Sequence, residues 1–178
     1  PGFAFGGSCL PKDVRALTYE AKRFDLESPV LNAILRSNTV QVQMGIRMVT
    51  DLGKKRVGFL GMAFKPDTDD MRESPLVAVI ETLLGKGYDI KIFDRNVSTS
   101  RLIGANRRFI EEHIPHLSSL LTEDLDELAA HAEVLVVGYK SPEFVQVVEG
   151  LREDQVVIDL ARLDVEAPTR ARYEGICW

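Results

Sequence analysis

The sequence predicts an α/β protein in which a Rossmann-like parallel sheet domain follows a helical segment. Two observations carry this prediction. Short apolar runs with the length of buried strands recur after residue 53, and stretches with helical spacing separate them. The residues before that point show helical spacing only. A chain of 178 residues can hold one domain and an accessory piece, so we divide it into residues 1–53 and 54–178.

A first helix is predicted over residues 11–24. Pro11 suits its first turn, because the missing N–H needs no partner there. Its apolar residues recur at spacings of three and four, namely Val14, Leu17, Ala21 and Phe24. Ser28 and Pro29 then provide a cap and a first turn for a second helix, which is expected to run to about residue 52.

The second helix carries two apolar stripes on different faces. One stripe comprises Leu31, Ile34, Leu35, Val42, Ile46, Val49 and Leu52, and the other comprises Val40, Met44 and Met48. We expect such a helix to join two bodies or to pack against a second subunit, because both faces need burial. Gly45 costs the helix about 1 kcal/mol of propensity, which predicts close approach of another backbone. Asn38 lies on the first stripe and is interpreted as a buried amide with satisfied hydrogen bonds.

From residue 54 onward, strands and helices alternate. Strands are predicted at residues 56–61, 88–93, 133–137, 155–159 and 173–178. Helices are predicted at residues 75–85, after a Ser74 cap, at 124–131, and from Pro142 onward. Residues 98–116 are polar and are predicted to be partly helical, without a defined helix boundary. Repeated strand–helix units predict a parallel sheet with helices on both faces.

Composition excludes several classes of function. The formal net charge is −5 and the longest basic cluster is residues 54–56. The sequence therefore lacks the concentration of basic residues that is typical of nucleic-acid-binding proteins. No membrane-span run and no secretory signal are present, and two cysteines make no disulfide framework, so we expect a cytoplasmic protein. The three histidines lack metal-ligand spacing. The chain begins at Pro1 without Met, and we expect it to be part of a longer polypeptide.

Cys9 is the candidate nucleophile, because it follows two glycines and directly precedes the first helix. Free N–H groups and the helix dipole favour an anion there, and a nearby cation further favours the thiolate form of a cysteine. Lys12 and Asp13 follow at i+3 and i+4, so all three residues can face one spot if the helical turn begins at Cys9. The competing interpretation makes Cys9 a small buried apolar residue and Asp13 an ordinary first-turn acid.

The second candidate site is the charged loop at residues 61–74, which follows the first predicted strand. Ligands of open α/β sheets gather beyond the carboxyl ends of the strands, so Lys65 is placed to meet a nucleotide phosphate. Asp94 ends the next strand, where dinucleotide-binding folds often hold a ribose-binding acid, and a turn-forming aspartate explains it as well. The competing interpretation is a solvated loop whose charges pair among themselves.

Two motifs in this order, FGGSCLPKD at residues 5–13 and GMAFKPDTDDMRES at residues 61–74, resemble the UDP-glucose/GDP-mannose dehydrogenase family. The resemblance spans essentially the whole chain, and PGFAF at its start, FDRNV at 93–97 and EGICW at its end resemble the GDP-mannose branch. UDP-sugar relatives carry an Asp-Gly-Arg run that is shifted here, so Arg162 does not inherit its nucleotide-binding role. The family's N-terminal NAD-binding domain is absent from this sequence.

The resemblance implies an NAD-dependent oxidation of a nucleotide sugar, GDP-mannose to GDP-mannuronate, in two hydride transfers without a metal ion. The matching positions are Cys9 and Asp13 for catalysis, Lys12 and Arg72 for the NAD cofactor, and Phe3, Gly6 and Lys65 for the nucleotide sugar. In these roles Cys9 is the nucleophile and Asp13 positions or activates water. The helix after Pro29 corresponds to the family's central helix, which joins two domains and builds a homodimer.

The family's catalytic lysine and asparagine belong to the part that is absent, so the chain alone is expected to be inactive. Together with the absent part, the chain would form GDP-mannuronate, which would be a precursor of an acidic exopolysaccharide such as alginate. Two alternatives stay open: a UDP-glucose or other UDP-hexose 6-dehydrogenase, and a non-catalytic nucleotide-binding and dimerisation module.

Overall fold

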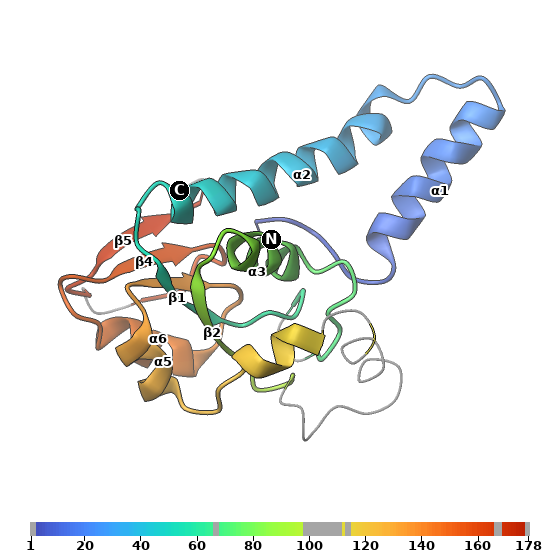
Figure 1. Cartoon of the computed structure of the whole chain (residues 1–178). Coiled ribbons are helices and arrows are strands. Elements are labelled where there is room, and N and C mark those ends of the chain that lie inside the picture. The colour runs from blue at the N-terminus through green and yellow to red at the C-terminus, as the bar shows by residue number, and fades with distance from the viewer. Residues whose placement is uncertain (1–2, 66–67, 98–111, 113–114, 166–168, 177–178) are drawn as a thin grey trace.

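A parallel five-stranded sheet forms the body of the protein in the computed structural model (Figure 1), which describes residues 3–65, 68–97, 112, 115–165 and 169–176. The strands, in the spatial order β2-β1-β3-β4-β5, are β1 (Arg56–Leu60), β2 (Asp89–Phe93), β3 (Val134–Val137), β4 (Val156–Asp159) and β5 (Arg172–Gly175). The chain runs from the centre out to β2 and then returns to β3, so β1 and β3 flank the point where the strand order reverses. The predicted strands are confirmed, except that Cys177 and Trp178 lie outside the described residues.

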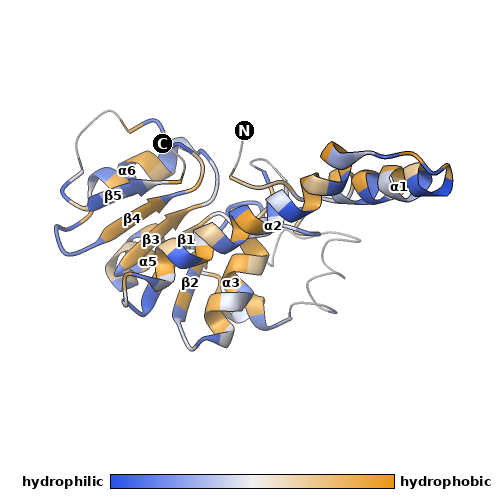
Figure 2. Ribbon diagram, turned by 90° about the horizontal axis from the view of Figure 1, so that it is seen from above, coloured by the Kyte–Doolittle hydropathy of each residue, from blue (hydrophilic) through white to orange (hydrophobic). Residues whose placement is uncertain are grey.

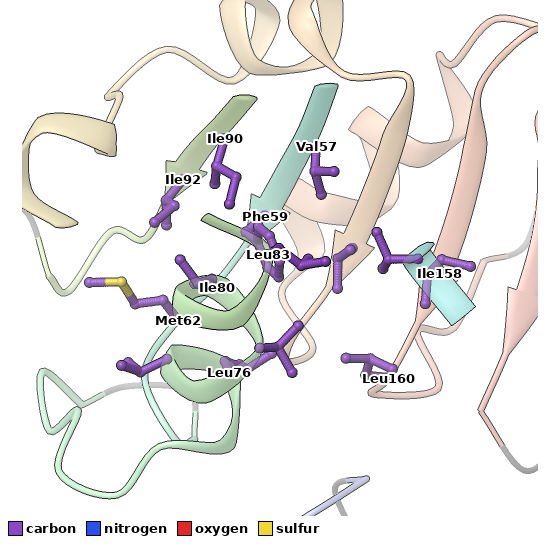
Figure 3. Packing of buried hydrophobic residues seen from close by; sticks show 14 of the residues in the cluster. Val57, Phe59, Met62, Leu76, Ile80, Leu83, Ile90, Ile92, Ile158 and Leu160 are labelled. Atoms are coloured by element: carbon purple, nitrogen blue, oxygen red, sulfur yellow. The ribbon is translucent and has the colours of Figure 1, made fainter. Parts of the chain in front are cut away.

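Helices cover both faces of the sheet, as predicted. On one face lie α2 (Pro29–Thr50) and α3 (Pro75–Gly85), whose apolar side chains join one buried cluster with those of alternate strand residues. Figure 3 shows the α3 side of this cluster. On the other face lie α5 (Leu125–His131) and α6 (Pro142–Glu149). Gly58 of β1 allows α5 to approach, because a Cβ there would lie 2.7 Å from the side chain of Leu128. The fold is therefore held by two apolar layers, one on each side of β1, β3 and β4.

A hairpin of α1 (Leu10–Arg23) and α2 extends away from the sheet (Figures 1 and 2). Among the helical residues of α1 only Pro11 is buried, and α2 is buried only where it nears the sheet, at Gly45, Ile46 and Val49. The exposed large apolar residues of the described chain gather on this hairpin: Leu10, Leu17, Tyr19, Phe24, Leu26, Val30 and Val40. The burial predicted for both stripes of the second helix is thus supplied by the described residues only near the sheet.

Two local predictions need correction. Ser28 and Ser74 hold the N-cap positions of α2 and α3, but neither side chain makes a capping hydrogen bond. Gly45 meets side chains rather than another backbone, since a Cβ there would lie 3.5 Å from the Phe3 ring and 3.7 Å from Leu160. Most of the polar stretch at residues 98–116 lies outside the described residues, and its last two residues begin a 3-10 helix, η1 (Pro115–Leu120). Across the described ranges, every helix is too short or too polar to cross a bilayer.

Candidate active site

Cys9 lies at the N-cap position of α1, where the helical turn begins. Its carbonyl oxygen accepts the N–H of Asp13 at 2.9 Å, which places Lys12 and Asp13 in the turn that Cys9 opens. The cysteine is exposed, unlike the buried apolar residue of the competing interpretation. Ser8 Oγ lies 3.8 Å from Cys9 Sγ, and the Lys12 ammonium lies 3.4 Å from the Asp13 carboxylate. The thiol is therefore accessible at the start of the helical turn that carries Lys12 and Asp13.

The loop that follows β1 is fixed at its start by buried groups. We call residues 61–65 and 68–74 the Lys65 loop. The N–H of Gly61 donates to the carbonyl oxygen of Phe93 at 2.8 Å. The carboxylate of Asp94, which directly follows β2, accepts the N–H groups of Met62 and Ala63 at 2.8 and 3.0 Å. Asp94 is thus the turn-forming aspartate of the second interpretation.

The outer part of the Lys65 loop carries charged side chains. Arg72 donates from Nε and Nη2 to the two carboxylate oxygens of Asp70, at 2.8 and 2.9 Å. Burial raises the pKa of Asp70, but the hydrogen bonds and charge of Arg72 outweigh burial and hold that pKa below its ordinary value. The Lys65 ammonium lies 5.3 Å from the centre of the Phe64 ring, a cation–π distance. Charge pairing within the loop, the competing interpretation, is therefore real for Asp70 and Arg72.

The cysteine loop, residues 3–9, packs directly against the Lys65 loop. The N–H of Gly7 donates to the carbonyl oxygen of Arg72 at 3.0 Å. A Cβ on Gly6 would lie 2.1 Å from the carbonyl oxygen of Glu73. Gly7 has a φ of +84°, and a Cβ on it would lie 3.0 Å from the Phe64 ring. Two glycines in succession therefore permit a contact between backbones that larger residues would prevent.

Charged side chains reinforce this contact. The guanidinium of Arg15, on α1, donates to both carboxylate oxygens of Glu73 at 2.9 and 2.6 Å, and these hydrogen bonds lower the pKa of Glu73. Glu73 has a φ of 51°, an uncommon conformation for a residue other than glycine. Hydrogen bonding to Asp70 and the negative charge of that carboxylate raise the pKa of Arg72. The residues at this contact are therefore held by two ion pairs, Arg15–Glu73 and Arg72–Asp70.

The start of the cysteine loop is held on α2. The Asn38 side chain accepts the N–H of Phe5 at 2.8 Å and donates to the carbonyl oxygen of the same residue at 2.8 Å. The interpretation of Asn38 as a satisfied amide is therefore confirmed. The ring of Phe3 packs over Gly45, beside Leu160 from the loop after β4. The segment that carries Phe3 thus lies between the hairpin and the sheet domain.

The structure brings most of the predicted site residues to one side of the molecule. Gly6 and Arg72 take part in the contact between the two loops, and Cys9 ends the cysteine loop two residues after Gly7. The Lys65 ammonium lies over the ring of Phe64, which packs near Gly7. Lys12 and Asp13 lie in the adjoining turn and pair with each other, and Phe3 packs on α2.

Several residues that build this region were missed by the reasoning from sequence. The role of Asp70 could have been found from the local sequence, because an acid two residues before an arginine can accept hydrogen bonds from its guanidinium. Arg15 and Glu73 carry no such local signal, since they meet only through the tertiary fold. Within the described residues, no group of three His, Cys, Asp or Glu side chains is placed to hold a metal ion.

Comparison with known protein families gives two matches along the chain. Residues 58–164 match the UDP-binding domain of the UDP-glucose/GDP-mannose dehydrogenase family, and residues 1–40 match the central domain of that family. Among curated relatives, GDP-mannose 6-dehydrogenase of Pseudomonas aeruginosa is 52% identical over the whole chain, and that of Azotobacter vinelandii is 46% identical. UDP-glucose 6-dehydrogenase of Rickettsia bellii is 29% identical over 91% of the chain.

Solved structures give a consistent result. A ternary complex of GDP-mannose dehydrogenase from Pseudomonas aeruginosa matches with a TM-score of 0.91 at 52% identity, covering 100% of this chain and 41% of that one. A UDP-glucose dehydrogenase from Pyrobaculum islandicum matches with a TM-score of 0.78 at 32% identity, covering 99% of this chain and 39% of that one. The chain spans 41% of the length of each curated GDP-mannose 6-dehydrogenase named above. It belongs to the UDP-glucose/GDP-mannose dehydrogenase family.

Proposed function

We propose that the chain is the catalytic-cysteine and nucleotide-sugar-binding part of an NAD-dependent GDP-mannose 6-dehydrogenase. The observation that carries this proposal is the contact between the cysteine loop and the Lys65 loop, in which Gly7 bonds to Arg72. It sets an exposed thiol, a guanidinium and an ammonium on the same side of the fold. The greater identity to GDP-mannose 6-dehydrogenases than to the UDP-glucose enzyme favours GDP-mannose as the substrate.

In the proposed reaction the primary alcohol of the sugar is oxidised in two stages. NAD, when bound, accepts a hydride at each stage. Loss of the first hydride and the hydroxyl proton gives an aldehyde, and the Cys9 thiolate adds to its carbon to form a thiohemiacetal. Loss of the second hydride and a proton gives a thioester on Cys9. Water then cleaves the carbon–sulfur bond, which releases GDP-mannuronate and returns the thiol.

The neighbouring residues take supporting roles in this proposal. Asp13, one turn after Cys9, would orient the water that attacks the thioester. Lys12 and Arg72, whose side chains are 66% and 43% exposed, are two accessible cations, one in the turn that Cys9 opens and one in the loop that contacts the cysteine loop, and they suit the anionic NAD cofactor. Lys65 would bind the diphosphate of the nucleotide sugar, with Phe3 and Gly6 completing that site.

The apolar hairpin supports a homodimer. Tyr19, Phe24 and Val30 are 65%, 68% and 76% exposed, which is costly for large apolar side chains on a free surface. We place a second copy of α2 and the NAD-binding domain of the family against this hairpin. The catalytic lysine and asparagine would come from outside this chain, so the chain alone should bind nucleotide without turnover. The acid product suits the synthesis of an acidic exopolysaccharide such as alginate.

Two experiments test the proposal. Calorimetry with the chain should detect GDP binding without NADH formation, and absence of any GDP binding would refute the nucleotide site. A side-by-side rate assay of the full-length dehydrogenase with GDP-mannose and UDP-glucose should favour GDP-mannose. A faster rate with UDP-glucose would instead support the alternative suggested by the match to a UDP-binding domain.

A further inference from the structure

Asp94 fills a position where Rossmann-like folds bind a ligand. Its side chain is almost fully buried, with the residue 4% exposed. One carboxylate oxygen accepts the N–H groups of Met62 and Ala63 at 2.8 and 3.0 Å, and the other accepts the N–H of Asn96 at 3.0 Å. Three backbone donors therefore converge on one buried anion.

In dinucleotide-binding α/β domains, N–H groups in the loop after the first strand face a pyrophosphate, and an acid after the second strand faces a ribose. Here the matching acid is Asp94, and its carboxylate accepts hydrogen bonds from the N–H groups of the loop after β1. The space above the loop is filled as well, because a Cβ on Gly61 would lie 2.4 Å from the Tyr139 ring. The N–H groups and the glycine that follow β1 are thus covered by the side chains of Asp94 and Tyr139.

The same contacts fix the course of the Lys65 loop. Besides the bonds to Asp94, the carbonyl oxygen of Met62 accepts the hydroxyl of Ser74 at 2.8 Å. The loop therefore leaves β1 in one defined direction, and the next two residues are Phe64 and Lys65. Phe64 lies against Gly7 of the cysteine loop, and the Lys65 ammonium lies over the Phe64 ring.

We infer that Asp94 is an internal substitute for a phosphate, which closes the dinucleotide crevice of this domain and positions Lys65 toward the cysteine loop. The diphosphate of the nucleotide sugar then binds on the outer side of the Lys65 loop, between Lys65 and the cysteine loop, and not on the N–H groups that follow β1. Asp94 is a positioning residue, because it acts through the backbone of the loop. The statement that the diphosphate binds between Lys65 and the cysteine loop rests on the proposed function.

Chemical rescue tests the internal anion directly. In the full-length dehydrogenase, Asp94→Ala would leave the three N–H groups facing a hole that formate can fill. We expect sodium formate, but not sodium chloride at equal ionic strength, to raise the melting temperature of this variant. The same salt should leave the wild type unchanged. A melting temperature that does not respond to formate would overturn the inference, whether or not the enzyme binds GDP.

The positioning role is tested by affinity for GDP, measured by calorimetry. Asp94→Ala should weaken GDP binding about tenfold, the loss of one charge-assisted interaction, and formate should restore it. Asp124→Ala is the matched control, because the Asp124 carboxylate also accepts two backbone N–H groups, at 2.9 and 3.1 Å, but caps α5 on the other face. The control should lose stability without losing GDP affinity.

A second variant keeps the test decisive if Asp94→Ala does not fold. Asp94→Asn retains one oxygen for Met62 and Ala63 but presents an amide donor to the N–H of Asn96, so GDP binding should weaken severalfold while the fold persists. Unchanged GDP affinity in Asp94→Asn would contradict the positioning role. A wild-type enzyme that fails to bind GDP would refute the proposed function and leave the formate result to decide on the internal anion.

Discussion

The backbone N–H of Gly7 donates a 3.0 Å hydrogen bond to the carbonyl oxygen of Arg72, and so joins the cysteine loop to the Lys65 loop. The glycine before Gly7 and the glutamate after Arg72 also meet at close range. The relative position of the exposed cysteine and the basic loop is thus fixed by backbone groups on both sides. Side-chain substitutions that keep the two backbones close should preserve this arrangement, and those that separate them should not.

Gly6→Ala should separate the two loops. The new Cβ would lie 2.1 Å from the carbonyl oxygen of Glu73 and 2.7 Å from Pro75 Cδ, so a backbone must move. We expect a loss of about 1–3 kcal/mol in unfolding free energy, the usual effect of overpacking. Denaturant titration checks this. Gly85→Ala is the control, because Gly85 ends α3 with no atom within 4 Å of its added Cβ, and it should be neutral or stabilising.

Asn38→Ala should release the start of the cysteine loop from α2. The amide of Asn38 satisfies both the N–H and the carbonyl oxygen of Phe5, so its removal leaves two partly buried groups without that partner. The expected loss is about 1–3 kcal/mol, seen as faster hydrogen exchange of the Phe5 amide. Asn32→Ala, at an exposed position on the same helix, should leave that exchange rate unchanged. Equal exchange rates in both variants would show that Asn38 does not hold the loop.

Asp70→Asn should weaken the support of Arg72 and reduce the sensitivity of folding to acid. The pKa of Asp70 is lowered in the folded protein, so its contribution to stability is complete above the unfolded-state pKa and is lost as pH falls through the folded-state pKa. The variant should lose about 1–2 kcal/mol near neutral pH and show a shallower decline in acid. Asp154→Asn removes an exposed carboxylate two residues from Arg152 and should have little effect.

Tyr173→Phe should remove an alkaline dependence of stability. The hydroxyl of Tyr173 donates to Asp159, which is fully buried. Burial raises the pKa of Tyr173, and the hydrogen bond and charge of Asp159 raise it further. The contribution of the Tyr173 hydroxyl to the free energy of unfolding is therefore fully present below the unfolded-state pKa of a tyrosine, about 10. It is lost as pH rises toward the folded-state pKa. Unfolding free energies between pH 8 and 11 should decline in the wild type and less in the variant; parallel curves would contradict this.

Local patterns in the sequence were sufficient for most of the fold. The apolar run after Arg56 and the proline at 142 mark a strand and a helix that the structure confirms within a residue. The order of the strands in the sheet was not predictable. It depends on which strand each crossover helix leads to as a neighbour, and the local sequence does not record that. The exposed hairpin was not predicted either, since an apolar stripe such as that of Leu17 indicates a need for burial without showing what supplies it.

The candidate site was predictable as two motifs but not as one arrangement. The glycines before Cys9 indicated freedom of the backbone, whereas the partner that needs it, the carbonyl oxygen of Glu73, is distant in sequence. Asp94 illustrates the same limit. Its position after a strand suits a ribose-binding acid, and only the folded chain shows its carboxylate turned onto the N–H groups of Met62 and Ala63.

The central claim is that Cys9 forms a covalent bond with the oxidised sugar. The most direct measurement is the amount of GDP-mannuronate formed by full-length Cys9→Ala enzyme supplied with GDP-mannose and NAD. We expect the variant to form about a thousandfold less acid or still less, with GDP affinity unchanged. Acid production at the wild-type rate would contradict it.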